Sequence, residues 1–484
     1  MALYLTGSSS VNSSRSNSGI KLNEIYSKTE LGEMELDESR EKDSLKIHHN
    51  FSKINTDWDS LSGQFNNIGA NALDTWFSAI GLNLSKKLGV DPGLVSSASV
   101  LITKALHEFF PNIMVDQNFS MMDMSGRLLR SPLHILDGIF SSGGELLSKS
   151  PLANLGTIML TAFGLSKAEK GKDLNELHYH NLHGTISRSL LHQFASLSAS
   201  SAQKLTNKMP LISVLLGLCL PMSKAIKNFD MPWDKLETVL GQNLFHFSDA
   251  LYSSIAHKLI SPLKKNLGAT VALSTAGLVG LNNLSTIKKS LNLEKIFETK
   301  ILNNNFHGRV QRSIWNFAEN IAFALGDRIS NSSLGSIISP LYLLFAFNST
   351  QSKSVELNTI EGFTQRLGYD FANSLLSGFS NKISGLIPAP ILAAVGPSLA
   401  NLIGSKLKDR SCAFNTSDGL RLRNFTHFFD NLVTTSVYKT ANKIFELGKK
   451  KIEPALTGSI LSDGRWLRPD GRIVSNMALG KNLT

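Results

Sequence analysis

The chain has 484 residues, of which 42% are hydrophobic and 18% charged, and its formal net charge is +11. These proportions exclude a chain that is disordered throughout, because such chains combine few hydrophobic residues with a high charge. The length predicts two to four domains unless a repeat continues one architecture along the chain. Two cysteines, Cys219 and Cys412, exclude a disulfide framework.

Residues 1–50 form the first compositional segment. They are rich in Ser and Asn, then acidic in "ELGEMELDESREKD", and they predict a disordered leader. Six Lys and Arg stand against eight Asp and Glu there, so the remainder carries about +13. The leader lacks the basic start and continuous apolar core of a secretory signal peptide. We expect folded structure to begin near Asp57.

A short phrase recurs after the leader, in which a glycine is followed four residues later by an arginine. The first-turn glycines, counting weaker matches, are at 63, 126, 184, 241, 308, 362 and 419, which predicts about seven repeats of roughly 60 residues over 57–460. "DGRWLRPDG" (463–471) repeats the spacing, whereas "LGQNLFHFSDAL" (240–251) has Phe245 in place of the arginine. The arginines of the clear copies are Arg130, Arg188, Arg312, Arg366 and Arg423.

Two helices are predicted in each repeat. After the arginine, segments such as "NFAENI" (316–321) and "DFANSL" (370–375) set an apolar stripe at helical spacing, which predicts an amphipathic helix A. A proline-led apolar run then predicts helix B, as in "SPLANLGTIMLTAFGLSK" (150–167) and "APILAAVGPSLANLIGSK" (389–406). Helix B must pack on neighbouring repeats, so the sequence predicts an all-α chain of tandem helical hairpins, either an α-solenoid or a closed helical array.

The residue before each glycine is the expected N-cap of helix A: Ser125, His183, His307, Glu361, Asp418 or Asp463. The arginine then falls one turn into the helix, where it opposes the helix dipole and needs a carboxylate or backbone carbonyl as its partner. We interpret the five arginines chiefly as links between repeats. The alternative is a row that grips an acidic or phosphorylated ligand.

The sequence contains no complete catalytic or cofactor motif. "HYHNLH" (178–183) gathers three histidines without a completing ligand pattern, and "LHEFF" (106–110) lacks the second histidine of a metalloprotease helix. Walker, nucleophile-elbow and dinucleotide motifs are not found. We therefore expect a non-enzymatic protein without a metal or cofactor. No dense basic run with interleaved aromatic residues is present, which disfavours nucleic acid as a partner.

The apolar runs raise the question of a membrane. Residues 383–404 are uncharged for 22 residues, which is long enough to span a bilayer, but the run contains Pro388, Pro390 and Pro397. The other runs are shorter and suit buried helices. Conditional insertion of several B helices into a target membrane, perhaps around a pore, stays an alternative, and the basic body is compatible with an anionic membrane surface.

The leader composition together with a helical repeat body resembles bacterial effectors that are injected through type III secretion systems. The resemblance implies delivery into a host cell, to its cytosol or membrane, and a secretion chaperone that binds residues 1–50. Our first hypothesis is an effector that binds a host protein through its stacked A helices, and the second is the membrane-active protein described above. Residues 461–484 are expected to form a polar C-terminal cap or tail.

Overall fold

The computed structural model describes residues 54–87, 90–109, 119, 123–172, 176–177, 181–222, 227–356, 358–407 and 409–456. It also describes three two-residue strands, β1 (Ser459–Ile460), β2 (Trp466–Leu467) and β3 (Ile473–Val474), which pair antiparallel in the order β1-β2-β3. Before these strands, all the regular elements of the described chain are helical, which confirms the predicted all-α class. The leader, most of 461–484, and both His178 and His180 lie outside the described residues.

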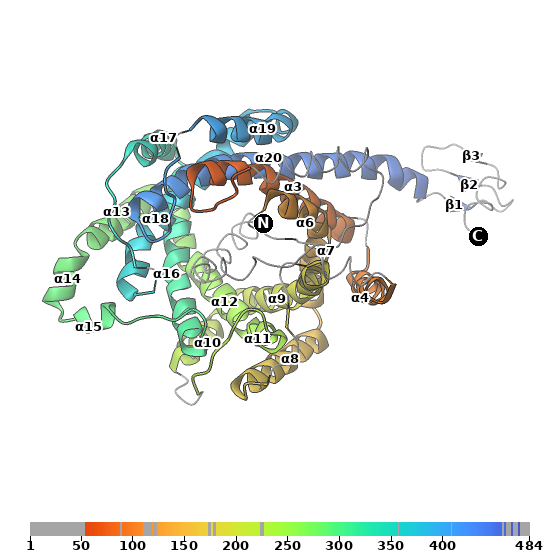
Figure 1. Ribbon diagram of the computed structural model, residues 1–484, viewed down its shortest axis with the longest axis horizontal. Coiled ribbons are helices and arrows are strands. Elements are labelled where there is room, and N and C mark those ends of the chain that lie inside the picture. Colours follow the sequence, from red (N-terminus) through yellow and green to blue (C-terminus); the bar gives the residue numbers. More distant parts are fainter. Residues whose placement is uncertain are drawn as a thin grey trace, which may run out of the picture.

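The segments predicted as helix A form helices α3, α7, α9, α12, α16, α18 and α20, which we call the A helices. Each packs against the A helix before it and the one after it, and α20 packs against α3, so their contacts form a closed cycle (Figure 1). Their bounds are Leu61–Lys87, His134–Leu147, Leu182–Lys208, Asn243–Ile260, Phe306–Ser330, Ile360–Leu386 and Ser417–Leu456. Two of them are preceded by short helices, α6 (Met124–Arg130) with η2 (Ser131–Leu133) before α7, and α11 (Leu236–Gly241) before α12.

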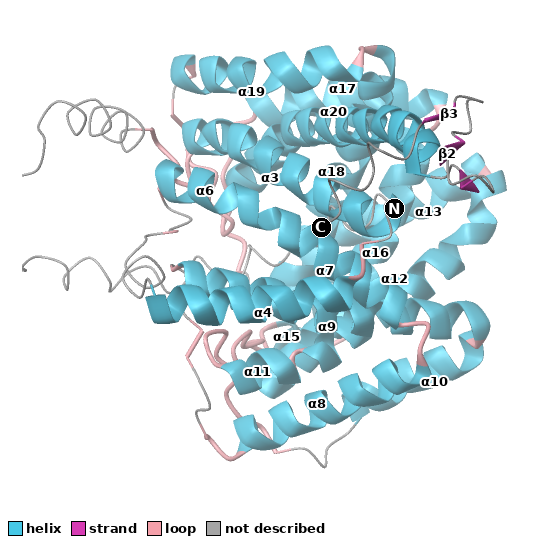
Figure 2. Cartoon of the chain, turned by 90° about the vertical axis from the view of Figure 1, so that its right-hand side faces the viewer, coloured by secondary structure: helices cyan, strands magenta, loops and turns pink. Residues whose placement is uncertain are grey.

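The proline-led runs form helices α4, α8, α10, α13, α17 and α19, which we call the B helices. Figures 1 and 2 both place α17 and α19 along one edge of the molecule and α8 and α10 along the opposite edge. Their bounds are Pro92–Phe109, Pro151–Glu169, Pro210–Met222, Leu267–Asn282, Ser333–Asn348 and Ala389–Lys406. A short 3-10 helix, η3 (Ser261–Lys265), precedes α13, and α14 (Leu284–Ser290) and α15 (Glu294–Phe297) follow it.

The starts of the A helices are joined by isolated backbone bridges. The N-cap residue of one A-helix segment pairs with a residue five positions before the N-cap of the previous segment. Known pairs are Glu176 with Lys235, Asp230 with Asn305, Lys300 with Thr359, Ser354 with Thr416 and, between the last segment and the first, Ser411 with Ser60. The bridges therefore follow the same closed order as the helix contacts.

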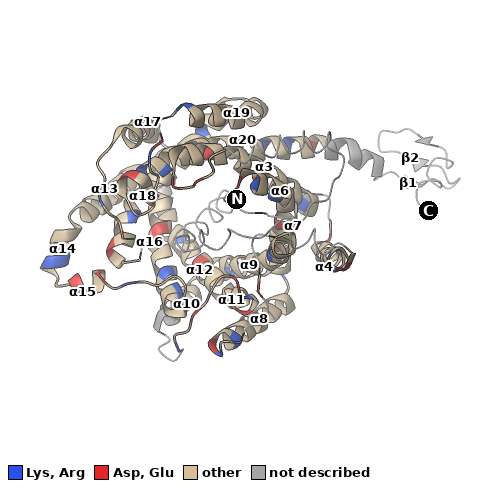
Figure 3. Ribbon diagram, in the orientation of Figure 1, with Lys and Arg blue, Asp and Glu red and all other residues tan. Residues whose placement is uncertain are grey.

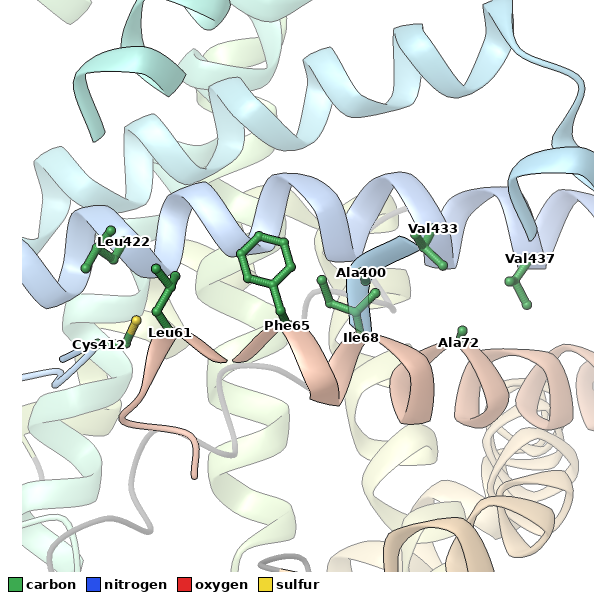
Figure 4. Packing of buried hydrophobic residues seen from close by; sticks show 9 residues of the cluster. All are labelled: Leu61, Phe65, Ile68, Ala72, Ala400, Cys412, Leu422, Val433 and Val437. Carbon is green, nitrogen blue, oxygen red and sulfur yellow. The ribbon is translucent and has the colours of Figure 1, made fainter. Parts of the chain in front are cut away.

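The largest cluster of buried hydrophobic residues lies where the first and last A helices meet (Figure 4). Phe65 of α3 is fully buried, and its ring centroid lies 5.5 Å from that of Phe429 and 6.1 Å from that of Phe425, both on α20. Ala400 of α19 and Cys412 belong to the same cluster. Cys412 is buried and free, and burial raises the pKa of its thiol to about 12.

The predicted N-caps are wrong by two residues. Helix α9 begins after Asn181, α16 after Asn305 and α18 after Thr359, and in each case the cap side chain accepts a hydrogen bond from the backbone N–H of the glycine. Asp123 caps α6 in the same region of the phrase. The residues before the glycine, such as His183 and His307, therefore lie inside the helices, and Asp463 lies outside the described residues.

The repeat start predicted at Gly241 is also displaced. Gly241 is the last residue of α11, and α12 begins two residues later. The residue that bridges to Glu176 is Lys235, so the counterpart of the first-turn glycine is Thr238. Its hydroxyl bonds the carbonyls of Pro232 and Lys235, which closes this helix start without a glycine.

Candidate functional site

A buried residue stands four positions before each A-helix cap. It is Thr56, Phe119, Leu177, Met231, Ile301, Val355 or Cys412, and each is at most 6% exposed. The backbone N–H of Met231 donates to Asn304 across 2.6 Å, and that of Cys412 donates to Asp59 across 2.7 Å. Leu177, Met231, Ile301, Val355 and Cys412 all donate their backbone N–H to the neighbouring segment, so five of these buried residues lie beside a backbone bridge, away from water.

Two of the predicted arginines make these same connections. Arg188, which is 8% exposed, donates to the carbonyl of Leu177 in its own segment and of Trp233 in the next, at 3.1 and 3.2 Å. Arg423, which is 5% exposed, donates to the carbonyl of Cys412 at 2.5 Å. It also donates to the carbonyl of Trp58 at 2.9 Å and to the Asp59 carboxylate at 2.7 Å. These guanidinium groups link neighbouring segments.

The other predicted arginines are partly buried and have different surroundings. Arg312 and Arg366 lie 5.5 and 5.9 Å from the centroid of the Phe363 ring, a cation–π arrangement between α16 and α18. Burial lowers the pKa of Arg312, and the nearby Glu319 opposes the change. Arg130 lies at the end of α6. The predicted arginines therefore lie on equivalent helix positions without forming one exposed row.

The expected partner carbonyls at the end of helix B exist, but another arginine bonds them. Arg410 donates to the carbonyls of Phe347 and Ser349 at the end of α17, at 2.5 and 2.8 Å. It also forms an ion pair with Asp418 at 3.1 Å. Sequence reasoning missed this residue because it lies before the phrase, in the segment that leads to α20.

A polar belt runs along the A helices, on positions 8 and 11 after the first-turn residue. Three residues make less than one helical turn, so both positions lie on one face of each helix. The belt consists of Asn71, Asp74, His134, Asp137, His192, His246, Asp249, Asn316, Glu319, Asp370, Asn373, His427 and Asp430, with Ala195 as the exception. His192 is exposed, and the other belt residues are intermediate in exposure.

Hydrogen bonds and ion pairs of the belt connect neighbouring A helices. Asn71 on α3 donates to Asp430 on α20 at 3.0 Å. His134 on α7 lies between two carboxylates, with Nδ1 2.8 Å from Asp137 and Nε2 3.6 Å from Asp74 of α3. Ser313 on α16 donates to Asp249 on α12 at 2.6 Å. The belt thus joins helices that are far apart in the sequence.

Burial shifts the pKa of several belt residues. It lowers the pKa of His246 to about 4, and together with the charge of Arg423 it lowers that of His427 to about 4. Burial also raises the pKa of Asp430 to about 6, against the hydrogen bond from Asn71. The pKa of Asp370 rises to about 7, through burial and the neighbouring Glu319. Burial therefore favours the uncharged forms of His246, His427 and Asp430, whereas the pKa of His134 is raised because its hydrogen bond to Asp137 and the charge of Asp74 outweigh burial.

We expect replacement of His427 by glutamine to flatten the pH dependence of stability between pH 6.5 and 4. The pKa of His427 falls from 6.5 to about 4 on folding, so in this window only the unfolded chain binds the proton. The wild-type protein thus loses up to about 1.4 kcal/mol per pH unit as the pH falls, and the variant lacks this loss. Urea denaturation at pH 7, 5.5 and 4.5 measures it. Parallel curves for both proteins would contradict the assignment.

The B helices have an inverted distribution of side chains. Every residue that the structure describes as buried in them is Ser, Thr, Gly or Ala, as with Gly396, Ala400 and Gly404 of α19. Many of their large apolar side chains are exposed, Leu152 of α8 by 80% and Leu211 of α10 by 72%. The B helices therefore pack on the A helices through small residues and present apolar stripes outward, the reverse of an ordinary water-facing helix.

Glycine positions on the B helices explain this close packing. A Cβ added at Gly404 would lie 2.9 Å from the Cβ of Phe65, and one at Gly396 would lie 2.7 Å from Val433. At Gly164 of α8 it would lie 2.6 Å from the Glu237 carbonyl oxygen. Larger residues at these positions would push the B helices away from the A helices. The inward side of each B helix therefore holds small residues, and large side chains lie on the outward side.

The described helices differ from ordinary membrane-spanning helices. None of them is, alone, long and apolar enough to cross a bilayer. Two neighbouring pairs satisfy the length and composition criteria together, but each is bent, α13 with α14 by 71° and α16 with α17 by 110°. Among the described residues, no cluster of His, Cys, Asp and Glu has a metal-binding arrangement either.

No protein family model, curated protein or solved structure matches this chain. The candidate sites are therefore defined by this structure: the polar belt on the A helices and the apolar stripes of the B helices.

Proposed function

We propose that this chain is a non-enzymatic module of seven tandem helical units that close into a ring, and that it acts as a secreted effector by binding a host component. The closed contact order of the A helices and the recurring backbone bridges support the ring. Equivalent positions also make equivalent contacts, since Asn320 bonds Ser253 at 2.8 Å and Asn431 bonds Ser377 at 2.6 Å. Such recurrence is typical of units that contact only their neighbours.

The binding surface in this proposal is the outer face of the B helices. The sequence predicts that the stacked A helices bind a host protein, but their polar belt is engaged in contacts between the helices. The B helices instead expose large apolar side chains over several turns, and contiguous exposed apolar surface is typical of protein or membrane interaction sites. This outward apolar face is the observation that carries the proposal.

The host component is either a protein or a membrane. Delivery through type III secretion and a chaperone at residues 1–50 are further parts of the same proposal, and they rest on the composition of the leader. Apolar stripes bordered by exposed lysines, as on α8 and α10, favour a membrane as this component.

Photo-crosslinking from the outer face tests this function. A benzophenone amino acid placed at Leu155 of α8 or Leu341 of α17, which are 54% and 61% exposed, should give protein or lipid adducts in host extract that contains membranes. The control position is Glu298, which is exposed but lies outside the B helices. We expect several-fold more adduct at Leu155 or Leu341. Equal labelling at all three positions would contradict a binding role for the outer face.

A further inference from the structure

Helices α8 and α10 form an outer surface in which apolar exposure and positive charge coincide. Both pack against the same two A helices, α9 and α12, and both lie along the same edge of the molecule (Figure 2). We call this surface the α8–α10 face. Its exposed large residues are Leu152, Leu155, Ile158, Met159, Phe163, Leu211, Ile212, Val214, Leu215 and Leu216.

The apolar residues of α8 follow a helical stripe. Leu152, Leu155, Met159 and Phe163 are separated by three, four and four residues, which places them on one side of the helix, and they are 46–80% exposed. On the opposite side, Thr157, Gly164 and Ala168 are the buried residues of the helix. A contiguous exposed apolar stripe of this kind is typical of an interaction surface.

Positive charge borders this face. Residues 145–172 and 201–216 contain six lysines and two glutamates, and none of these charges lies among the apolar residues between 150 and 166 or between 209 and 216. Figure 3 shows α8 free of charge over most of its length, with charged residues towards one end. Lys149, Lys170, Lys172 and Lys208 are exposed. Lysines at the rim of an apolar surface match an anionic lipid headgroup layer.

The length of α10 argues against a crossing, and none of the described helices is, alone, long and apolar enough to span a bilayer. Helix α8 has 19 residues, which makes it about 28 Å long, and α10 has 13 residues, which makes it about 20 Å long. A hydrocarbon core is about 30 Å thick. Helices of this length with lysines at their borders suit the interface of a bilayer, where the apolar side enters and the charged rim stays at the headgroups.

We infer that the α8–α10 face docks on an anionic lipid bilayer, with the apolar stripes of both helices entering the interfacial zone and the lysines contacting lipid phosphates. This inference rests on the proposed binding role of the outer face and names its partner. The bilayer is held from one side and is not crossed. The α17–α19 face on the opposite edge stays away from this bilayer, and Lys353 and Lys406 are the exposed lysines near its helices.

Vesicle co-sedimentation of the full chain tests the inference. The probes are vesicles of phosphatidylcholine alone and of phosphatidylcholine with 30% phosphatidylserine, at 0.1 and 0.5 M salt. We expect the protein to sediment with the phosphatidylserine vesicles several-fold more than with the neutral vesicles. High salt should weaken this binding without abolishing it, because screening removes only the ionic part. An encapsulated dye should stay inside.

Two matched fourfold variants identify the docking face. The first carries Leu155→Ser, Met159→Ser, Leu211→Ser and Leu215→Ser, and the second carries Leu341→Ser, Leu344→Ser, Val395→Ser and Leu399→Ser on the opposite edge. All eight residues are 48–65% exposed except Leu211, at 72%, so both variants should retain the helical circular dichroism of the wild type. We expect the first to lose vesicle binding at least tenfold and the second to keep it.

Each of the other outcomes would overturn the inference, and each has a different meaning. Equal loss in both variants would mean that lipid surrounds the molecule, and dye release would mean that helices enter more deeply. Sedimentation with neither vesicle would remove the bilayer as partner. If the first variant then also lost crosslinking to a purified host protein, the outer face would keep its proposed binding function with a protein partner. If neither variant changed any binding, the proposed function would fail as well.

Discussion

Replacing Phe65 by alanine is expected to lower the free energy of unfolding by about 3–5 kcal/mol, the cost of removing a fully buried aromatic side chain. The Phe65 side chain is 0% exposed and packs from α3 against α19 and α20 (Figure 4). Its neighbours Phe425 and Phe429 come from the opposite end of the described chain. The substitution therefore weakens the packing that closes the cycle of A helices, and urea denaturation followed by circular dichroism measures the loss.

The same variant separates a closed cycle from an open array. If α3 and α20 pack together in solution, hydrogen exchange should accelerate in both helices of the Phe65→Ala variant. Phe163→Ala on α8 is the control, because this ring is 46% exposed and its loss should cost less than about 1 kcal/mol. An equally small cost at Phe65, with acceleration restricted to α3, would show that the first and last helices are apart.

The starts of the A helices illustrate what the sequence could predict. The phrase located the glycines correctly in six of the seven segments, because a glycine at a fixed spacing is visible in one dimension. The true caps were also visible as Ser60, Asp123, Asn181, Asn305, Thr359 and Thr416, each three residues before the glycine. The N-cap prediction missed them because Ser125, Asp418 and Asp463, which stand directly before the glycine in three copies, are cap-forming types as well. The start of the fourth segment was predicted at the wrong residue because Thr238 stands where the other segments have the glycine.

The pairing of distant parts could not be predicted in this way. Helical periodicity shows which side of a helix is apolar, but it does not identify the partner, so the contact between α3 and α20 follows only from the three-dimensional structure. The B helices show a second limit. Their apolar content suggested burial, whereas burial is restricted to their small residues, such as Ser339 of α17 and Thr157 of α8. The polar belt was missed because its residue types differ from helix to helix.

Replacing Gly308 by alanine is expected to destabilise the protein by about 2–3 kcal/mol, although the glycine lies in a helix, where alanine is ordinarily preferred. An added Cβ would lie 1.6 Å from the carbonyl oxygen of Leu302 and 2.9 Å from Oδ1 of Asn305. The segment before α16 would have to move, and the 2.7 Å hydrogen bond from Gly308 N–H to the Asn305 cap would be lost. Urea denaturation of the variant measures the cost.

A second glycine provides the control with the opposite sign. Gly277 lies in α13 and has no atom within 4 Å of the position of an added Cβ, so Gly277→Ala should stabilise the helix by about 0.5–1 kcal/mol. The same clash recurs at Gly362, where the Cβ would lie 1.5 Å from the Glu356 carbonyl oxygen, so Gly362→Ala should behave like Gly308→Ala. Equal effects at positions 277 and 308 would mean that the first-turn glycine is not required by the segment that precedes the helix. Opposite signs would show that the first-turn position requires glycine, because the segment that precedes the helix passes close to the first turn of that helix.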